Sequence, residues 1–74
     1  MKKNLPATAR AVKNARRKLK ITQGELALRA GVGLHFVRDL EQGKANMNMA
    51  KVNRVLGLFG LELAPAKIEP RESE

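Results

Sequence analysis

Apolar residues recur at helical spacing in four separate stretches of this chain. In the first stretch, Val12, Ala15 and Leu19 follow the i, i+3, i+7 spacing of one helix face, which we expect to point inward. This spacing predicts a helix that begins near residue 6 or 8 and ends near residue 18. Pro6 suits the first turn of this helix, because proline lacks the N–H that would be unpaired there.

The second stretch begins with a capping signal and ends with a glycine. Thr22 and Glu25 stand three residues apart, as in a capping box, in which each side chain accepts a free backbone N–H of the other residue. Gly31 is suited to end this helix in a left-handed conformation, because glycine has no Cβ to clash there. The predicted inner face comprises Leu26, Ala27 and Ala30.

A third helix is predicted from about residue 33 or 34 to residue 42, with Gly43 directly after it. Val37 and Leu40 are three residues apart, and we expect them to face the core together with Phe36. This division leaves the outer side of the helix to Leu34, His35, Arg38 and Asp39.

A fourth helix and a short strand complete the pattern. The helix is predicted over residues 49–59, with Gly60 after it and an inner face of Met49, Val52, Val55, Leu56 and Phe59. Leu61 and Leu63 then alternate with Glu62, which indicates a strand over residues 61–67. A single strand is not stable alone, and its simplest partner is the same strand of a second copy. We therefore expect a homodimer.

Size and composition narrow the chemistry that this chain can perform. A chain of 74 residues forms one small domain with a modest core, which also favours oligomerisation. It has no cysteine and one histidine, so we expect neither disulfides nor a metal site, and the cysteine count fits the cytoplasm. No Ser/His/Asp set or paired carboxylates stand out, and no apolar run could span a membrane. We expect a cytoplasmic protein without enzymatic activity or cofactor.

Positive charge is concentrated at the start of the chain. The net charge is +8, and residues 1–20 hold eight lysines or arginines and no acid. The last six residues, EPRESE, carry three glutamates against one arginine. A basic first helix favours a polyanion as partner, with nucleic acid ahead of an anionic membrane, although such charge can also serve solubility alone. The scarcity of aromatic residues for base stacking argues against RNA.

The second and third predicted helices form a helix-turn-helix, a device whose second helix enters the DNA major groove. Gly31 allows the turn, Ala27 is small where the helices touch, and Val32 and Val37 fix their crossing. A nucleotide-binding loop is the alternative for the GVG stretch. Such a loop requires a preceding strand and further glycines or a Lys-Ser/Thr ending, and the sequence has neither. The predicted organisation is a basic arm (residues 1–5), a helix-turn-helix domain (6–60), a dimerisation strand (61–67) and a disordered tail (68–74).

The stretch LKITQGELALRAGVGLHFVRDLEQGK resembles the Xre/Cro/cI helix-turn-helix family, through its TQ-x-EL-A start and LE-x-GK end. The resemblance covers about residues 6–66 and is closest to HipB-like antitoxins, whose last helix and strand match VLGLFGLEL. It implies a compact all-α fold of four to five helices with a short C-terminal β-strand paired across a dimer. It also implies a repressor that binds a palindromic operator on double-stranded DNA, autoregulates its operon and binds a HipA-like kinase toxin. The alternative is a stand-alone Xre-family repressor with no toxin partner.

The resemblance assigns backbone contacts to two residues and a structural role to two others. Gln23 would bind a DNA phosphate through its amide and the adjacent N–H groups of the helix end. Lys44 would contact a second phosphate just after the third helix. Arg16 and Glu41 match an ion pair that joins the first helix to the third.

The resemblance also assigns the base-contacting positions. Arg38 would bind guanine with two hydrogen bonds, His35 would donate to a base edge or phosphate, and Leu34 would contact a thymine methyl. Gly33 would allow close approach of the backbone. An ion pair of Arg38 on its own helix and an ordinary surface role for His35 are the alternatives. Family members often carry polar residues where this chain has Leu34 and Phe36.

Overall fold

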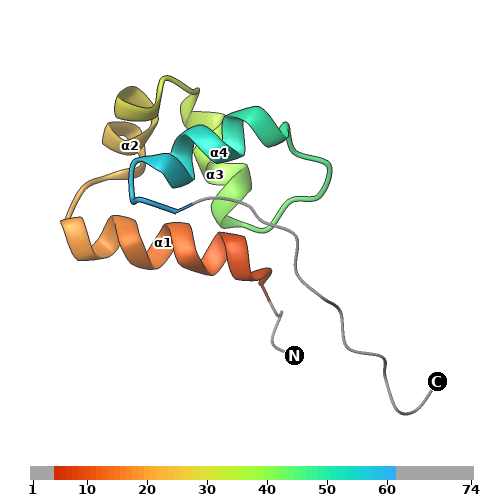
Figure 1. The fold of residues 1–74 in the computed structure, drawn as a ribbon, viewed down its shortest axis with the longest axis horizontal. Coiled ribbons are helices and arrows are strands. Elements are labelled where there is room, and N and C mark those ends of the chain that lie inside the picture. Colours follow the sequence, from red (N-terminus) through yellow and green to blue (C-terminus); the bar gives the residue numbers. More distant parts are fainter. Residues whose placement is uncertain (1–4, 62–74) are drawn as a thin grey trace, which may run out of the picture.

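A computed structural model describes residues 5–61 of the chain, and it is helical throughout its regular structure (Figure 1). The four helices are α1 (Ala7–Leu19), α2 (Gln23–Ala30), α3 (Leu34–Glu41) and α4 (Met49–Gly57). The all-α prediction is confirmed. The predicted strand lies outside the described residues except for Leu61, which is not in a strand, and the tail and all but one residue of the arm also lie outside them.

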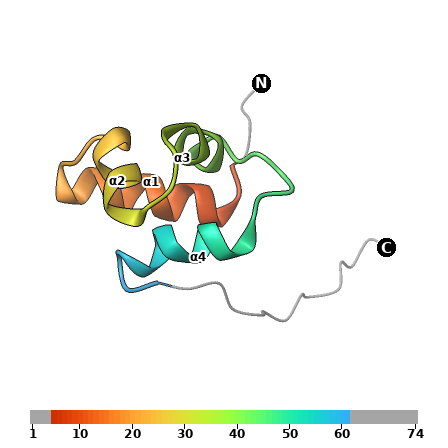
Figure 2. The same cartoon turned by 90° about the horizontal axis from the view of Figure 1, so that it is seen from above.

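The helices surround one hydrophobic core. In Figure 1, α1 runs along one side of the molecule and the other three helices lie on the opposite side, and Figure 2 shows the same arrangement from above. The contacts of α3 with both α1 and α2, and of α2 with α4, close the core. Each helix contributes at least one fully buried side chain to it, namely Val12, Leu26, Val37 and Val55.

The helix ends follow the sequence closely, with one difference. The Thr22 hydroxyl oxygen accepts a hydrogen bond from the Glu25 backbone N–H at 3.0 Å, as the capping signal predicts. The reciprocal bond is replaced, because the Glu25 carboxylate instead pairs with Arg29 one turn later on α2 at 3.1 Å. Gly31 adopts the predicted left-handed conformation, with φ 72° and ψ 33°.

Two predicted core positions are wrong, and both lie at helix ends. Leu19, the last residue of α1, is 56% exposed, and Met49, the first residue of α4, is 60% exposed. At a helix end the neighbouring helices no longer cover the apolar face, so correct spacing does not ensure burial. Helix α4 also ends earlier than predicted, because the N–H groups of Leu58 and Phe59 bond to carbonyls three residues back in a tighter turn.

Candidate DNA interface

The α2–α3 unit has the geometry of a helix-turn-helix. After Gly31, the Val32 backbone N–H bonds to the Ala27 carbonyl oxygen at 3.0 Å and closes the turn. Ala27 is buried on α2, Val37 is buried on α3, and Val32 packs half-buried against the same core. This packing fixes α3 relative to α2 and leaves the other side of α3 facing outward.

The outer side of α3 carries the predicted base-contacting residues. Leu34 is 39% exposed, and His35 and Arg38 are also exposed. Phe36 belongs with the core, since it packs half-buried against it and has the Lys51 amino group 5.8 Å from its ring centroid. Of the two apolar residues that depart from the family pattern, only Leu34 is therefore left for an external partner.

Gly33 precedes α3 in an extended conformation that every residue type can adopt, with φ −80°. A Cβ placed on it would meet nothing within 4 Å. The fold itself therefore does not require glycine at this position. Gly43, after α3, is the opposite case, because its φ is +81° and a Cβ there would lie 2.6 Å from Pro6 Cδ.

The buried carboxylate of Glu41, at the end of α3, connects this helix to α1 and to the start of α2. Glu41 is 1% exposed, and its Oε2 accepts from Arg16 Nε at 2.7 Å. Its Oε1 accepts from a terminal nitrogen of Arg16 at 3.0 Å and from Gln23 Nε2 at 3.1 Å. The other terminal nitrogen of Arg16 donates to the Ile21 carbonyl at 3.0 Å. The ion pair that the resemblance implies is present, and it includes Gln23 as a third member.

The charge of Glu41 is stabilised in the folded state. Burial raises the pKa of the Glu41 carboxyl, but hydrogen bonds from Arg16 and Gln23 and the attraction of Arg16 and Lys13 outweigh it. The net effect holds this pKa below its usual value. Glu41 is therefore ionised at neutral pH, and the ionised carboxylate only accepts hydrogen bonds.

The acids in residues 5–61 leave most of the positive charge uncompensated. Three acids face eleven lysines and arginines there, and each acid already has a basic partner. Lys44 lies 3.4 Å from Asp39 but keeps most of its side chain exposed. Within these residues no carboxylate lies within ion-pair distance of Arg38, so the predicted alternative of an ion pair on its own helix is not found.

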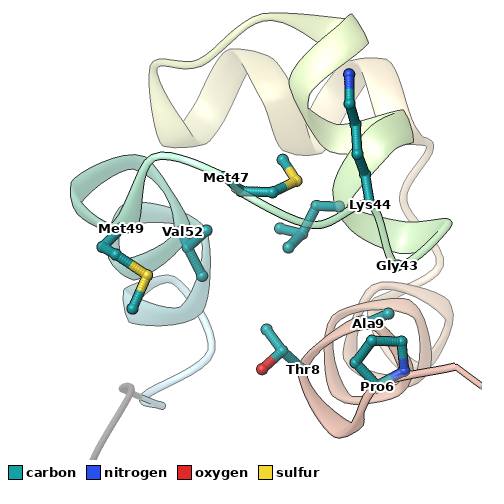
Figure 3. A pocket seen from close by; sticks show the side chains of 9 residues that line it. Pro6, Thr8, Ala9, Gly43, Lys44, Met47, Met49 and Val52 are labelled. Atoms are coloured by element: carbon teal, nitrogen blue, oxygen red, sulfur yellow. The ribbon is translucent and has the colours of Figure 1, made fainter.

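An apolar hollow of about 240 Å³ lies between the start of α1, the end of α3 and the start of α4. Figure 3 shows Lys44 extending away from it, with Pro6, Ala9, Met47 and Val52 on its walls.

Among residues 5–61 no three His, Cys, Asp or Glu side chains gather as a metal site requires. No helix in this part of the chain is long and apolar enough to cross a bilayer.

Comparison with known proteins agrees with this geometry. Residues 12–65 match the model of the helix-turn-helix family, and the chain belongs to this family, of the Xre type. It is therefore a helix-turn-helix transcriptional regulator of the DNA-binding class.

A relative in sequence supports the same class, and two other proteins share the fold. The chain is 42% identical over 52 residues to an uncharacterized HTH-type transcriptional regulator, y4mF, of Sinorhizobium fredii (strain NBRC 101917 / NGR234), covering 70% of this chain and 68% of the relative. Two solved structures share the fold with a TM-score of 0.69 at 22% identity, covering 93% of this chain and all of theirs. They are described as MDT protein and as the structure of a HipA-HipB-O2-O3 complex.

The bond between Gln23 and Glu41 is not predicted from the sequence. The family resemblance assigns Gln23 to DNA alone, and Glu41 to Arg16 alone. Gln23 begins α2 and Glu41 ends α3, so no local spacing signals their contact. Only the packing of α2 on α3 brings these residues together.

Proposed function

We propose that this chain is a homodimeric transcriptional repressor that binds a palindromic operator and acts in the cytoplasm. The observation that carries the proposal is the outer face of α3, where Leu34, His35 and Arg38 are exposed together while their neighbours hold the core. An exposed arginine without a carboxylate partner is suited to bind guanine, the commonest specific contact of this kind. Uncompensated positive charge on the same small domain supports phosphate binding.

The other contacts are proposed for the edges of this face. Gln23 contacts one phosphate with its amide and with the first N–H groups of α2, which have no acceptor within the helix. Lys44 contacts another phosphate just after the end of α3, exchanging its weak ion pair for that contact. Open space at Gly33 lets the start of α3 approach the DNA closely.

A second copy of the chain is proposed to cover the apolar groove between α1 and the segment after α4. Leu19, Leu58 and Leu61 are 56%, 43% and 42% exposed, and all three line this groove. The groove is continuous with the predicted dimerisation strand, because Leu61 is the first residue of that strand. Such a dimer places two α3 helices on half-sites about 34 Å apart along the DNA.

A toxin partner is the finer part of the proposal. The resemblance to HipB-like antitoxins and the fold shared with the structure titled HipA-HipB-O2-O3 complex support a HipA-like kinase as partner. The stand-alone repressor is the second candidate. Co-purification of the tagged chain with the product of an adjacent kinase-like gene supports the antitoxin function, and a chain that binds its promoter but not that product supports the stand-alone repressor.

Selection of DNA from a random-sequence library tests the DNA-binding function directly. We expect the wild-type protein to enrich a palindrome with half-sites one helical turn apart. Affinity for the selected duplex should fall steeply between about 50 and 200 mM salt, because phosphate contacts release counterions. Failure to enrich any sequence, together with binding that does not respond to salt, would reject the function.

A further inference from the structure

Gln23 has more hydrogen-bonding capacity than its contact with Glu41 uses. A glutamine amide nitrogen carries two N–H donors, and the structure uses one of them on Glu41 Oε1 at 3.1 Å. Within residues 5–61 no acceptor is found for the second. The Gln23 side chain is half-buried at the start of α2, so one side of it faces Glu41 and the other side remains accessible.

Glu41 also determines which way the Gln23 amide points. The two ends of an amide have nearly the same shape, and an isolated glutamine can flip between them at little cost. Because an ionised carboxylate only accepts hydrogen bonds, Glu41 selects the orientation in which the nitrogen faces inward. Arg16 holds Glu41 with two hydrogen bonds and neutralises its charge, so the carboxylate neither moves nor repels a nearby phosphate.

We propose that Glu41 is a positioning residue for DNA binding, which holds the Gln23 amide so that its second N–H is directed to a backbone phosphate. This inference rests on the proposed phosphate contact of Gln23. Glu41 belongs to α3, the same helix as Arg38, and stands one turn after it. Through Glu41, the phosphate contact and the base contact are therefore fixed to one rigid element, and phosphate contacts of this kind set the register in which bases are bound.

A double-mutant cycle on DNA affinity tests the proposal. The variants are Gln23→Ala, Glu41→Gln and the pair together, and the probe is the duplex that the wild type selects from a random-sequence library. Gln23→Ala alone should weaken binding about tenfold, as expected for one hydrogen bond to a charged group. In the Glu41→Gln background the same change should cost less than about twofold, because the amide is no longer oriented.

Gln42 gives a matched control within the chain. It follows Glu41 directly, its side chain is exposed, and it is the only other glutamine. Gln42→Ala should have the same effect on affinity in both backgrounds. If Gln23→Ala weakens binding equally in both backgrounds, Glu41 has only a structural role and the proposal is overturned. If the wild type binds no duplex at all, the proposed function fails instead.

Side-chain NMR of the wild type keeps the test decisive if Glu41→Gln does not fold. The two glutamines give two pairs of glutamine amide proton signals, one from each residue. We expect the Gln23 amide to be rigid on the picosecond-to-nanosecond timescale before DNA is added and the Gln42 amide to be mobile. Equal mobility of the two amides in the free protein would contradict the proposal.

Discussion

Replacement of Arg16 by methionine should destabilise the fold severely at neutral pH. Glu41 is 1% exposed and the Arg16 side chain only 14% exposed, so Arg16→Met leaves a buried carboxylate without its cation. Removal of one partner from a buried pair costs about 3–5 kcal/mol. The whole free energy of unfolding is about 4–11 kcal/mol for a chain of this length. Arg16→Met should therefore remove a large share of the stability.

The pKa shift of Glu41 determines how the stability of each variant changes with pH. In the wild type the Glu41 pKa is lowered by folding, so its contribution to stability is present above the unfolded pKa and is lost as the pH falls through the folded pKa. Without Arg16, burial remains as the main effect, and it raises this pKa. Arg16→Met should therefore gain stability relative to the wild type as the pH falls from 7 toward 5.

Urea unfolding followed by circular dichroism at pH 5 and pH 7 measures both effects. Arg17→Met is the control, because Arg17 is exposed next to Arg16 and forms no ion pair in the described part of the chain. It should change stability by less than about 0.5 kcal/mol. A cost below about 1 kcal/mol for Arg16→Met, with no change between the two pH values, would refute the assignment of Glu41 as a buried charge.

Further expectations concern DNA contacts, dimerisation and the glycines around α3. Arg38→Ala should abolish preference for the selected duplex over a mixed-sequence duplex without changing the circular dichroism, and an unchanged preference would show that Arg38 contacts no base. Leu19→Glu should shift the protein to monomer in sedimentation, whereas Leu28→Glu, at a position 82% exposed and outside the groove, should not. If both variants stay dimeric, the groove is not the interface. Gly43→Ala should destabilise the fold by at least about 1 kcal/mol, because its φ is +81° and its Cβ would meet Pro6. Gly33→Ala should leave stability nearly unchanged but weaken DNA binding, and equal unfolding midpoints for the two alanine variants would contradict this contrast.

Most of the fold could be predicted because its signals are local. Apolar spacing located all four helices, and Thr22 and Gly31 located the two ends of α2. Burial at Leu19 and Met49 could not be predicted in this way, since it depends on whether another helix reaches that end. Glu25 is a different case, because both the capping bond and the pair with Arg29 are local contacts of α2 and spacing alone does not choose between them.

Helical periodicity predicts which residues of α3 face outward, but it does not predict the bond between Gln23 and Glu41. The division of α3 into a core side and an outer side follows from helical periodicity, and the exposure of His35 and Arg38 agrees with it. The bond between Gln23 and Glu41 joins residues 18 positions apart and is not predicted, whereas the Arg16–Glu41 pair, 25 positions apart, is predicted only through the family resemblance. Such contacts depend on how helices pack, which one sequence does not specify through spacing.

The shared carboxylate of Glu41 has a consequence for how this protein responds to heat. Glu41 joins α1, the start of α2 and α3 through hydrogen bonds, so we expect the outer face of α3 to lose its geometry only when the rest of the domain unfolds. Loss of DNA binding on heating should then follow loss of the folded protein. Occupancy of the selected duplex measured against temperature should decline along the unfolding curve in a single transition.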